Sequence, residues 1–502
     1  MILTIDLGTS VTKVALWDEE GLLAVGRAEL DRSHQTGNRV EQDPASWWAS
    51  LVAACAAARA SAPGAFSAVH GIGCSAARQT FVPVTAGGEP IGTALVWSDR
   101  RASEEAALLT DALGGRRSAW MRTGVVLDGG SVAAKVAWLA SHDAERLRDA
   151  RWLLAPRDLV VWRLTGELCT DVTLASATGM YEWSGTNLTL VTEVAGAAAE
   201  RIPEVRPSTT IAGGLRDSAA RALGLPADVP VVIGAGDRPC EVLGTGATTA
   251  RPMVSWGTTA NVSVPVDERP DQPPVGLIVT AGALGGWLLE GGLSAAGSAV
   301  EWLAGLAGID SGVLLSSARS SPPGARGVLA FPWLGGARAP WWRADAGAGV
   351  VGLAFDHRPA DVARALVEGV AYDVVRCLEA AVGAGSPGVG AGPAGFVGAG
   401  EGGRAAPVEI ALGGGGSILP VWTDVLTAVT GLPAVRRRSG EAASAGAALL
   451  TAEALGIDVD VDRLDPVEGR VCPDAAEVAT YRSLRTRADE TAAALLALGN
   501  AR

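Results

Sequence analysis

Asp237, near the middle of the chain, has the sequence surroundings of a catalytic carboxylate. It follows the apolar run 231–233 and the segment Gly234-Ala235-Gly236. A carboxylate beside glycines at the end of an apolar strand adds little to a core, but it can face a cleft. There it could accept the proton of a substrate hydroxyl that attacks a phosphoryl group. The alternative is an Asx turn or a helix cap, which is the commoner use of such an aspartate.

The first apolar run of the chain ends in polar residues that could bind phosphate and magnesium. Gly8 would let the backbone turn tightly and approach a ligand. Thr9 and Ser10 would offer hydroxyl and N–H groups to phosphate oxygens. Asp6 could hold a hydrated Mg²⁺, an ion that keeps most of its waters, and Lys13 could add a positive charge. The alternative is an ordinary hairpin with a polar turn.

Two glycine-rich segments in the second half of the chain could also bind a nucleotide. One resembles the first turn in composition. The other places four glycines between an apolar run and a helical pattern, which suits a flat ligand lying on the backbone with its phosphates at a helix N-terminus. The alternative for the second segment is a flexible linker. The nucleotide-binding residues expected here are Gly257, Thr258, Thr259, Gly414, Gly415, Gly416 and Ser417.

A segment between residues 71 and 101 carries groups that suit a polyhydroxylated ligand. Arg78 and Gln79 can donate hydrogen bonds to hydroxyl oxygens. The face of Trp97 could cover the apolar C–H side of a sugar. The alternative is a surface Arg-Gln pair and a core tryptophan, since the chain has sixteen tryptophans.

Composition narrows the class of protein. The formal net charge of −13 argues against a nucleic-acid-binding protein, which usually shows a basic face. The six cysteines form no CxxC pairs and the four histidines do not cluster, so neither a disulfide framework nor a zinc site is expected. No run of about 18 apolar residues predicts a membrane span. With no secretion signal at the start, we expect a cytoplasmic protein.

Short apolar runs that alternate with alanine-rich helical patterns predict an α/β fold. The first two strands are too close in sequence for a crossover helix, so they should form a β-hairpin. A helix over 47–60 is expected, with Ser46 as its cap. The other expected strands are 231–233, 253–255 and 409–412, and the other expected helical stretches are 360–381 and 475–498.

The two glycine-rich hairpins, around Gly8 and Gly257, predict two related halves with a boundary near residue 247. Residues 1–247 would form one domain and residues 248–502 the other. The Gly/Pro-rich segment 382–406 is expected to be a loop of unassigned role.

Taken together, these segments resemble the FGGY carbohydrate kinase family, over about residues 2–485. Each motif alone is weakly specific, whereas their order and spacing together are highly specific. Further matching stretches are 40–44 (Val-Glu-Gln-Asp-Pro), 163–167 (Arg-Leu-Thr-Gly-Glu), 335–340 (Gly-Gly-Ala-Arg-Ala-Pro), 368–372 (Glu-Gly-Val-Ala-Tyr) and 441–448 (Glu-Ala-Ala-Ser-Ala-Gly-Ala-Ala).

The resemblance implies an ATP-dependent kinase with two actin-like, ribonuclease H-like domains and a cleft between them. It implies that Asp237 is the general base and that Asp6 lies near Mg²⁺. It adds Gly297 to the ATP-binding residues Gly8, Thr9, Ser10, Lys13, Thr258 and Gly414 to Gly416. It places Arg78, Gln79, Trp97, Asp237 and Arg238 in the polyol pocket.

A xylulose-like ketose is the first expectation for the substrate, because the donors of the pocket suit a chain of neutral hydroxyls. Gly129 and Gly130, where some relatives have an aromatic residue, predict room for something longer than glycerol. The alternatives are an aldonate of the gluconate type, whose carboxylate two arginines could bind, and a glycerol-type substrate. The alternatives to a kinase are a non-catalytic actin-like ATPase and a sugar sensor. For the assembly, a homodimer is left open.

Overall fold

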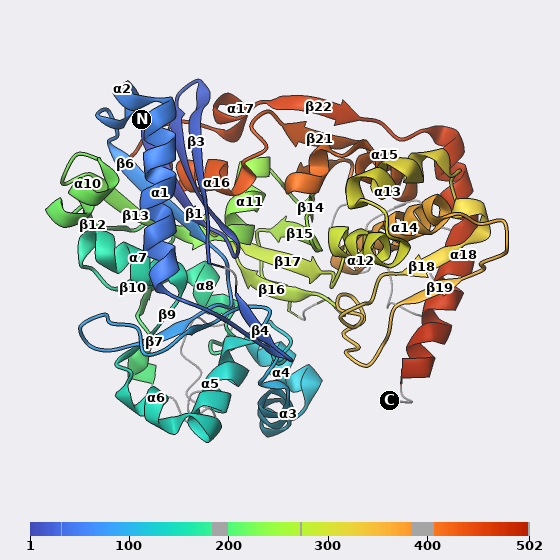
Figure 1. Cartoon of the computed structure of the whole chain (residues 1–502), viewed down its shortest axis with the longest axis horizontal. Coiled ribbons are helices and arrows are strands. Elements are labelled where there is room, and N and C mark those ends of the chain that lie inside the picture. The colour runs from blue at the N-terminus through green and yellow to red at the C-terminus, as the bar shows by residue number, and fades with distance from the viewer. Residues whose placement is uncertain (32, 183–198, 272–273, 384–405, 500–502) are drawn as a thin grey trace. The chain divides into compact units, whose positions relative to one another are not determined.

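The chain forms two compact units (Figure 1). The structure is a computed structural model that describes residues 1–31, 33–182, 199–271, 274–383 and 406–499. The first unit comprises Met1–Gly244, Val279–Trp287 and Glu441–Pro466, and the second comprises Thr245–Ile278, Leu288–Gly440 and Val467–Arg502. The expected boundary at residue 247 lies beside the first break between the units, and two later segments are grouped with the first unit.

The first unit is built on a six-stranded mixed sheet in the order β12-β13-β6-β1-β2-β3. Strand β1 is antiparallel to β2 and parallel to β6, and β6 is parallel to β13. The expected opening hairpin is therefore confirmed. The strands of this sheet are β1 (Ile2–Leu7), β2 (Val11–Asp18), β3 (Gly21–Glu29), β6 (Gly71–Ala76), β12 (Ile211–Gly214) and β13 (Pro230–Gly236).

Alternation along β1 separates its apolar and polar side chains. Leu3, Ile5 and Leu7 pack in the core that includes helix α1 (Ala45–Ser61), which lies along β2 and β3 in Figure 1. Because successive side chains of a strand point to opposite faces, Thr4 and Asp6 point to the other face. There the Thr4 hydroxyl oxygen lies 2.6 Å from the Ser444 hydroxyl oxygen on helix α16 (Ala442–Ala454). Asp6 thus reaches the polar face at the end of the strand.

Helix α1 begins earlier than the sequence predicts. It starts at Ala45, so Ser46 lies inside the first turn, and its hydroxyl donates to the Asp43 carbonyl. The cap assigned to Ser46 is wrong. The Asp43 carboxylate accepts instead from the Ala45 N–H at 2.9 Å, because an aspartate before a helix reaches the first free N–H groups more readily than a residue within it.

Smaller elements complete the first unit. A three-stranded sheet has the order β4-β5-β8, and two-stranded sheets pair β7 with β9 and β10 with β11. These strands are β4 (His34–Thr36), β5 (Arg39–Gln42), β7 (Val82–Val84), β8 (Ala94–Leu95), β9 (Trp152–Leu154), β10 (Cys169–Asp171) and β11 (Glu204–Arg206). The remaining helices are α2 (Pro63–Phe66), α3 (Ser103–Ala112), α4 (Arg116–Thr123), α5 (Val132–His142), α6 (Ala144–Asp149), α7 (Pro156–Thr165), α8 (Val172–Ser176), α10 (Asp217–Leu223), α11 (Asp237–Thr245) and α17 (Val461–Leu464).

The second unit is built on a seven-stranded sheet in the order β16-β17-β15-β14-β20-β21-β22, although most of the edge strand β16 is grouped with the first unit. Strand β14 is antiparallel to β15 and parallel to β20, and β20 is parallel to β21. A separate pair joins β18 (Leu329–Phe331) to β19 (Gly349–Val351). The strands of the large sheet are β14 (Met253–Trp256), β15 (Ala260–Val266), β16 (Ile278–Ala281), β17 (Trp287–Gly292), β20 (Ile410–Gly413), β21 (Ala434–Arg437) and β22 (Val467–Val471).

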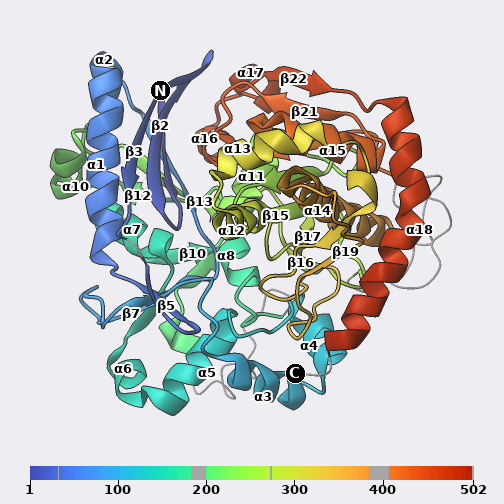
Figure 2. The same ribbon diagram turned by 45° about the vertical axis from the view of Figure 1, so that its right-hand side comes forward.

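Helix α14 (Pro359–Val382) is buried along almost its whole length in the second unit. It contacts α15 (Pro420–Thr430), which in turn contacts α18 (Ala475–Leu498), the long C-terminal helix in Figure 2. The buried charge of Glu368 on α14 is satisfied by Arg364 at 2.9 Å and by the Tyr481 hydroxyl of α18 at 2.7 Å. The expected helices 360–381 and 475–498 are confirmed. This unit also contains α12 (Gly297–Ala307) and α13 (Ser311–Ser317).

Both large sheets share one pattern, in which an antiparallel hairpin is followed by two strands parallel to its first strand. The prediction of two related halves is therefore confirmed at the level of topology. Residues 384–405 of the expected loop at 382–406 lie outside the described residues. Among the helices that the structure describes, none is by itself long and apolar enough to cross a membrane. The bent pair α12 and α13 meets that test by length and composition alone.

Candidate active site

Three parallel strands of the first unit end side by side, and a candidate site residue follows each of them. Asp6 is paired in register with Ser75 of β6, and Gly236 of β13 with Ala76 of β6. Because the carboxyl ends of parallel strands meet at one edge of a sheet, the turns after β1, β6 and β13 lie next to one another. These turns carry the phosphate-binding candidates, Arg78 with Gln79, and Asp237.

The backbone before Asp237 is held in a shape that requires glycine. Gly234 has a φ of 69°, and a Cβ there would lie 1.7 Å from the Cys74 carbonyl oxygen. The buried guanidinium of Arg157 donates to the carbonyls of Ile233 and Gly234 at 2.8 and 2.9 Å. The end of β13 is thereby fixed where helix α11 begins at Asp237.

One oxygen of the Asp237 carboxylate is engaged and the other is open. Oδ1 accepts from the Arg238 N–H at 2.7 Å and lies 3.7 Å from Arg78 Nε. Oδ2 has no partner among the residues that the structure describes, and 39% of the side chain is exposed. Asp237 is the first residue of α11, and its carboxylate accepts from the N–H of the next residue rather than from one further along the helix. A carboxylate oriented on one oxygen and free on the other can receive a proton.

Asp6 is a carboxylate whose surroundings favour a cation. The Ser75 hydroxyl donates to Asp6 Oδ1 at 3.0 Å. Burial raises the pKa of Asp6 to about 6, the nearby Lys13 opposes the rise, and the negative charge of Asp237 adds to it. Two nearby carboxylates repel each other, and a divalent cation would relieve that repulsion. The donor set therefore fits a hydrated Mg²⁺. Among the described residues, no group of three or more acidic, histidine or cysteine side chains forms a complete metal site.

Lys13 points to the same face of the sheet as Asp6, its register partner in β2. Its ammonium lies 2.9 Å from Glu441, just before α16, and Arg27 binds the other oxygen of the same carboxylate. Burial opposes protonation, but Glu441 raises the pKa of Lys13 above its ordinary value. Lys13 is therefore a charged residue whose charge is already shared with Glu441.

The expected pocket residues after β6 and β8 lie close to these turns. Gln79 has a φ of 60°, unusual for a residue with a side chain, and its amide donates to the Ala177 carbonyl at 3.2 Å. The Trp97 indole N–H donates to the Thr9 hydroxyl at 2.9 Å. The structure thus connects the tryptophan expected in the sugar pocket with a residue of the first phosphate turn.

Two expectations about substrate selection are affected by the structure. Arg238 Nη1 lies 2.7 Å from Glu241 Oε2, one turn along α11, so its charge is engaged by a carboxylate. Gly129 and Gly130 do not leave open room. A Cβ at Gly129 would lie 2.5 Å from Ser103 Oγ, and one at Gly130 would lie 1.5 Å from Arg100 Nη1. The expected space is wrong because Arg100 and Ser103 fill it.

In the second unit, the turn after β14 lies against the start of helix α12. The Gly297 N–H donates to the Gly257 carbonyl at 3.0 Å, and a Cβ at Gly297 would lie 2.8 Å from that oxygen. The Ser298 N–H donates to the Thr258 carbonyl at 3.1 Å. Gly297 therefore permits a close approach that brings Gly257 and Thr258, both exposed, to a helix N-terminus.

The four-glycine segment follows β20, the parallel neighbour of β14. Gly414 has a φ of 73°, and a Cβ there would lie 2.2 Å from the Trp256 carbonyl oxygen. A Cβ at Gly416 would lie 2.8 Å from Trp256 Cβ, whereas one at Gly415 would meet nothing within 4 Å. The Ser417 hydroxyl donates back to the Gly414 carbonyl at 2.7 Å. The segment is thus a fixed turn, with Gly415 exposed and open to a ligand.

Several residues around the site escaped prediction. Ser75 and Arg157 contact Asp6 and the end of β13, and Glu441 pairs with Lys13. Lys135 lies fully buried beneath Gln79. The rarity of lysine could have drawn attention to it, because lysine occurs only at positions 13 and 135. The motif 441–448 likewise marked Glu441, but its partner could not be inferred.

Comparison with known proteins identifies relatives across almost the whole chain. Residues 1–244 match the N-terminal domain of the FGGY family of carbohydrate kinases, and residues 253–455 match its C-terminal domain. The chain is 27% identical to the xylulose kinase of Escherichia coli (strain K12) over 97% of both sequences. It is 32% identical to a glycerol kinase of Cereibacter sphaeroides over 76% of this chain and 78% of that protein.

The fold is shared with solved carbohydrate kinases. The crystal structure of gluconate kinase from Lactobacillus acidophilus superposes with a TM-score of 0.86, at 21% identity, over 99% of this chain and 98% of that one. The expected fold class, α/β with two ribonuclease H-like domains, is confirmed. The relatives carry names for three different substrates, so the comparisons leave the substrate of this chain to be inferred from its own residues.

Proposed function

Since the chain belongs to the FGGY family of carbohydrate kinases, phosphotransferases that use ATP as the phosphate donor, we propose that it phosphorylates one hydroxyl of a xylulose-like ketose, with Asp237 as the general base. The observation that carries this proposal is the state of the Asp237 carboxylate. Its Oδ1 is oriented by Arg238 and Arg78, and its Oδ2 has no partner among the described residues.

The proton transfer follows from that arrangement. The acceptor hydroxyl would donate to Asp237 Oδ2, and its oxygen would attack the γ-phosphorus of ATP as the proton moves to the carboxylate. The new O–P bond forms while the bond between the γ-phosphorus and the β,γ-bridging oxygen breaks, and ADP leaves. Arg78 keeps Oδ1 turned away from the hydroxyl, so one carboxylate oxygen orients while the other accepts.

Nucleotide binding is assigned to turns in both units. In the first unit, Gly8, Thr9 and Ser10 would bind phosphate oxygens, with Lys13 as a supporting charge. Asp6 would hold Mg²⁺ through water, and the ion would neutralise charge on the phosphates. In the second unit the assigned residues are Gly257, Thr258, Thr259, Gly297, Gly414, Gly415, Gly416 and Ser417.

A neutral acceptor is favoured over an aldonate by the pairing of the two arginines. Arg238 is bound to Glu241, and Arg78 lies beside Asp237. With their charges already compensated by these carboxylates, the arginines attract a substrate carboxylate less strongly, whereas neutral hydroxyls do not depend on an uncompensated charge. Trp97 would contribute its ring face, because its N–H is already bonded to Thr9. Arg78, Gln79, Trp97, Asp237 and Arg238 form the proposed acceptor pocket.

The alternatives remain an aldonate and a glycerol-type acceptor, since relatives carry both names. The filled space at Gly129 and Gly130 removes one argument against glycerol. A non-catalytic ATPase or sugar sensor does not agree with a family of kinases. The cytoplasmic location and a homodimeric assembly stay predictions.

A kinase assay over a panel of acceptors tests the proposal. Purified protein with ATP and Mg²⁺ would be incubated with pentuloses, glycerol and other polyols, and gluconate and other aldonates. ADP release and the mass of the phosphorylated product would be measured together. We expect the highest kcat/KM with a xylulose-like pentulose. Turnover of an aldonate without turnover of any pentulose would overturn the assignment of substrate.

A further inference from the structure

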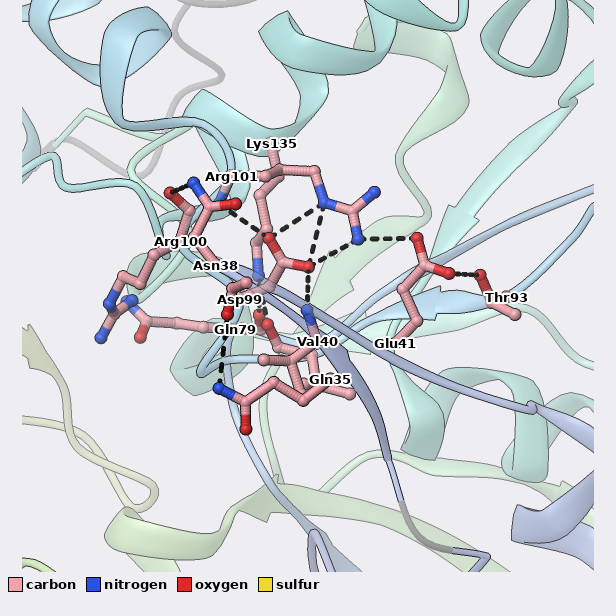
Figure 3. A network of polar contacts seen from close by, with 12 residues as sticks. Gln35, Asn38, Val40, Glu41, Gln79, Thr93, Asp99, Arg100, Arg101 and Lys135 are labelled. Atoms are coloured by element: carbon pink, nitrogen blue, oxygen red, sulfur yellow. Dashed lines mark hydrogen bonds and ion pairs between the residues drawn. The ribbon is translucent and has the colours of Figure 1, made fainter.

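Lys135 is a fully buried lysine in the first unit, and its ammonium donates to two backbone carbonyls. Nζ donates to the Gln79 carbonyl at 2.7 Å and to the Val96 carbonyl at 2.9 Å. The ring of Phe81 lies 5.9 Å from Nζ. Among the residues that the structure describes, no carboxylate forms an ion pair with it. Figure 3 shows this ammonium beside the Asp99 network.

Such a burial is unfavourable for packing alone. An ammonium without a paired charge is expensive to remove from water, and an apolar side chain of similar size would fill the same space at no such cost. Burial lowers the pKa of Lys135 to about 7, while Asp99 opposes the shift without touching the ammonium. The group is therefore expected to have a role beyond filling the core.

The two carbonyls belong to the two segments that carry the acceptor-pocket side chains. Gln79 is held at a φ of 60°, a strained conformation for a residue with a side chain. Its carbonyl is bound by Lys135 while its side-chain amide binds Ala177. Val96 directly precedes Trp97. Lys135 therefore bridges the residue after Arg78 and the residue before Trp97.

Other hydrogen bonds also join the same two segments, but they do not involve the Gln79 carbonyl, which Lys135 binds. Phe81 and Leu95 exchange backbone hydrogen bonds at 3.2 and 2.9 Å, and the Trp97 N–H donates to the Thr80 hydroxyl at 3.1 Å. The Val96 carbonyl also accepts from the Asp99 N–H at 3.0 Å. Asp99 in turn binds Arg101 and the Val40 N–H, as Figure 3 shows. The direct hydrogen bonds between the two segments end at Thr80. The Lys135 ammonium adds a bridge at the next residue, the strained Gln79.

We propose that Lys135 is a positioning residue for the acceptor: by bridging the Gln79 and Val96 carbonyls it fixes Arg78, Gln79 and Trp97 in the arrangement that binds the sugar. The inference rests on the proposed function of that pocket. Lys135 itself takes no part in phosphoryl transfer, so its loss should affect acceptor binding more than the chemical step.

Lys135→Met removes both hydrogen bonds and the buried charge while keeping a similar length. We expect the KM for the acceptor to rise by about tenfold or more, as when a charge-assisted hydrogen bond is lost. The kcat at saturating acceptor and the KM for ATP should change less than the acceptor KM, because they are reached only indirectly, through Arg78 beside Asp237 and through Trp97 bonded to Thr9. The Tm should change little, because removal of a desolvated charge offsets the loss of the hydrogen bond to the Gln79 carbonyl. A Tm that falls while the acceptor KM stays unchanged would show a structural role only and overturn the proposal.

Two further variants make the test specific. Ser131→Ala alters a buried hydroxyl at the start of the same helix, which donates to the Asp128 carbonyl at 2.8 Å rather than to a carbonyl of Gln79 or Val96. It should leave the acceptor KM unchanged. Lys135→Gln keeps a neutral N–H donor, and its acceptor KM should lie between those of wild type and Lys135→Met. If Lys135→Met does not fold, a wild-type KM in Lys135→Gln overturns the proposal.

A double-mutant cycle tests the route through Gln79. Glycine adopts a positive φ without strain, so Gln79→Gly removes the need for the lysine to hold that peptide. Lys135→Met should then raise the acceptor KM less in the Gln79→Gly background than in wild type. Equal effects in both backgrounds would contradict the route. If the wild-type protein phosphorylates no sugar or polyol, the proposed function fails and this inference with it; if wild type is active and the variants share its acceptor KM, this inference alone fails.

Discussion

The indole N–H of Trp97 donates to the hydroxyl of Thr9 at 2.9 Å, although the two residues lie 88 positions apart in the chain. Trp97 follows β8 in the proposed acceptor pocket, and Thr9 lies in the turn after β1 that we assign to phosphate binding. Thr9 is also fixed through its carbonyl, which accepts from Gln42 at 3.1 Å. A substitution of Trp97 should therefore change the kcat/KM for ATP.

Trp97→Phe separates the two roles of the tryptophan, because it keeps an apolar face and removes the N–H. We expect kcat/KM for ATP to fall about fivefold, the worth of one neutral hydrogen bond of about 1 kcal/mol. The acceptor KM should change less. Thr9→Val should reproduce the effect, and the double variant should add little to either single change. Independent, additive effects would show that the contact does not connect the two ligands.

The pKa of Asp6, raised by burial to about 6, predicts a pH dependence. Activity should fall as the pH drops through about 6, because a protonated Asp6 cannot hold Mg²⁺. For stability, the folded state binds the proton more tightly than the unfolded chain. The unfolding free energy of wild type, relative to Asp6→Asn, should therefore be greatest below about pH 4 and fall as the pH rises to about 6.

Urea unfolding of both proteins at several pH values measures this difference, and Asp6→Asn cancels contributions from other groups. A difference that stays constant between pH 4 and 7 would contradict the raised pKa. Asp6→Asn should also lose most of its activity at every pH, since a neutral amide is a poorer partner for Mg²⁺ than a carboxylate.

Gly415→Ala tests the nucleotide turn of the second unit. A Cβ at this position meets no protein atom within 4 Å, so the Tm should stay close to that of wild type. If the nucleotide lies on this backbone, the added methyl group should weaken ATP binding by about tenfold or more. Calorimetric titration with a non-hydrolysable ATP analogue measures the affinity of the variant for the nucleotide.

Gly305→Ala is the matched control for that variant. Gly305 is exposed on α12, and a Cβ at this position would likewise meet no protein atom within 4 Å. Alanine should stabilise this helix slightly and leave ATP binding unchanged. Equal ATP affinity in both variants would place the nucleotide elsewhere.

Arg238→Gln distinguishes a neutral from a carboxylate acceptor. Because Arg238 is already bound to Glu241 at 2.7 Å, a neutral ketose should lose little affinity when the guanidinium is removed. A carboxylate substrate that had recruited this arginine would lose roughly 1.5–3 kcal/mol. Glu241→Gln, which frees the arginine, should likewise have little effect on a neutral acceptor. A loss of that size with the preferred substrate would favour an aldonate.

The elements of this fold were largely predictable because local patterns set them. The hairpin around Gly8, the strands β13, β14 and β20, and the helices α14 and α18 follow from apolar runs, glycines and periodicity. The cap of α1 was missed because helix ends cannot be placed to better than one or two residues from local sequence. The helix begins at Ala45, so Ser46 lies inside its first turn.

The contacts that orient the site were not predictable, because their partners are distant in sequence. Lys13 and Glu441 are 428 positions apart, and Arg157 reaches Gly234 across 77. Gly129 and Gly130 suggested empty space, since a sequence shows the missing side chain but not the neighbour, Arg100, that fills its place. Motif spacing indicates which residues come together in the site, but not which carboxylate pairs with which cationic side chain.

The most direct measurement is the turnover of Asp237→Asn with the preferred acceptor. The variant keeps the shape of the side chain and loses its basicity, so it should fold, keep the Tm of wild type and bind ATP with wild-type affinity. We expect acceptor-dependent formation of ADP and phosphorylated product to fall by about 10²–10⁴-fold, the usual contribution of a general base. A folded variant that retained more than about a tenth of wild-type turnover would contradict the assignment of Asp237.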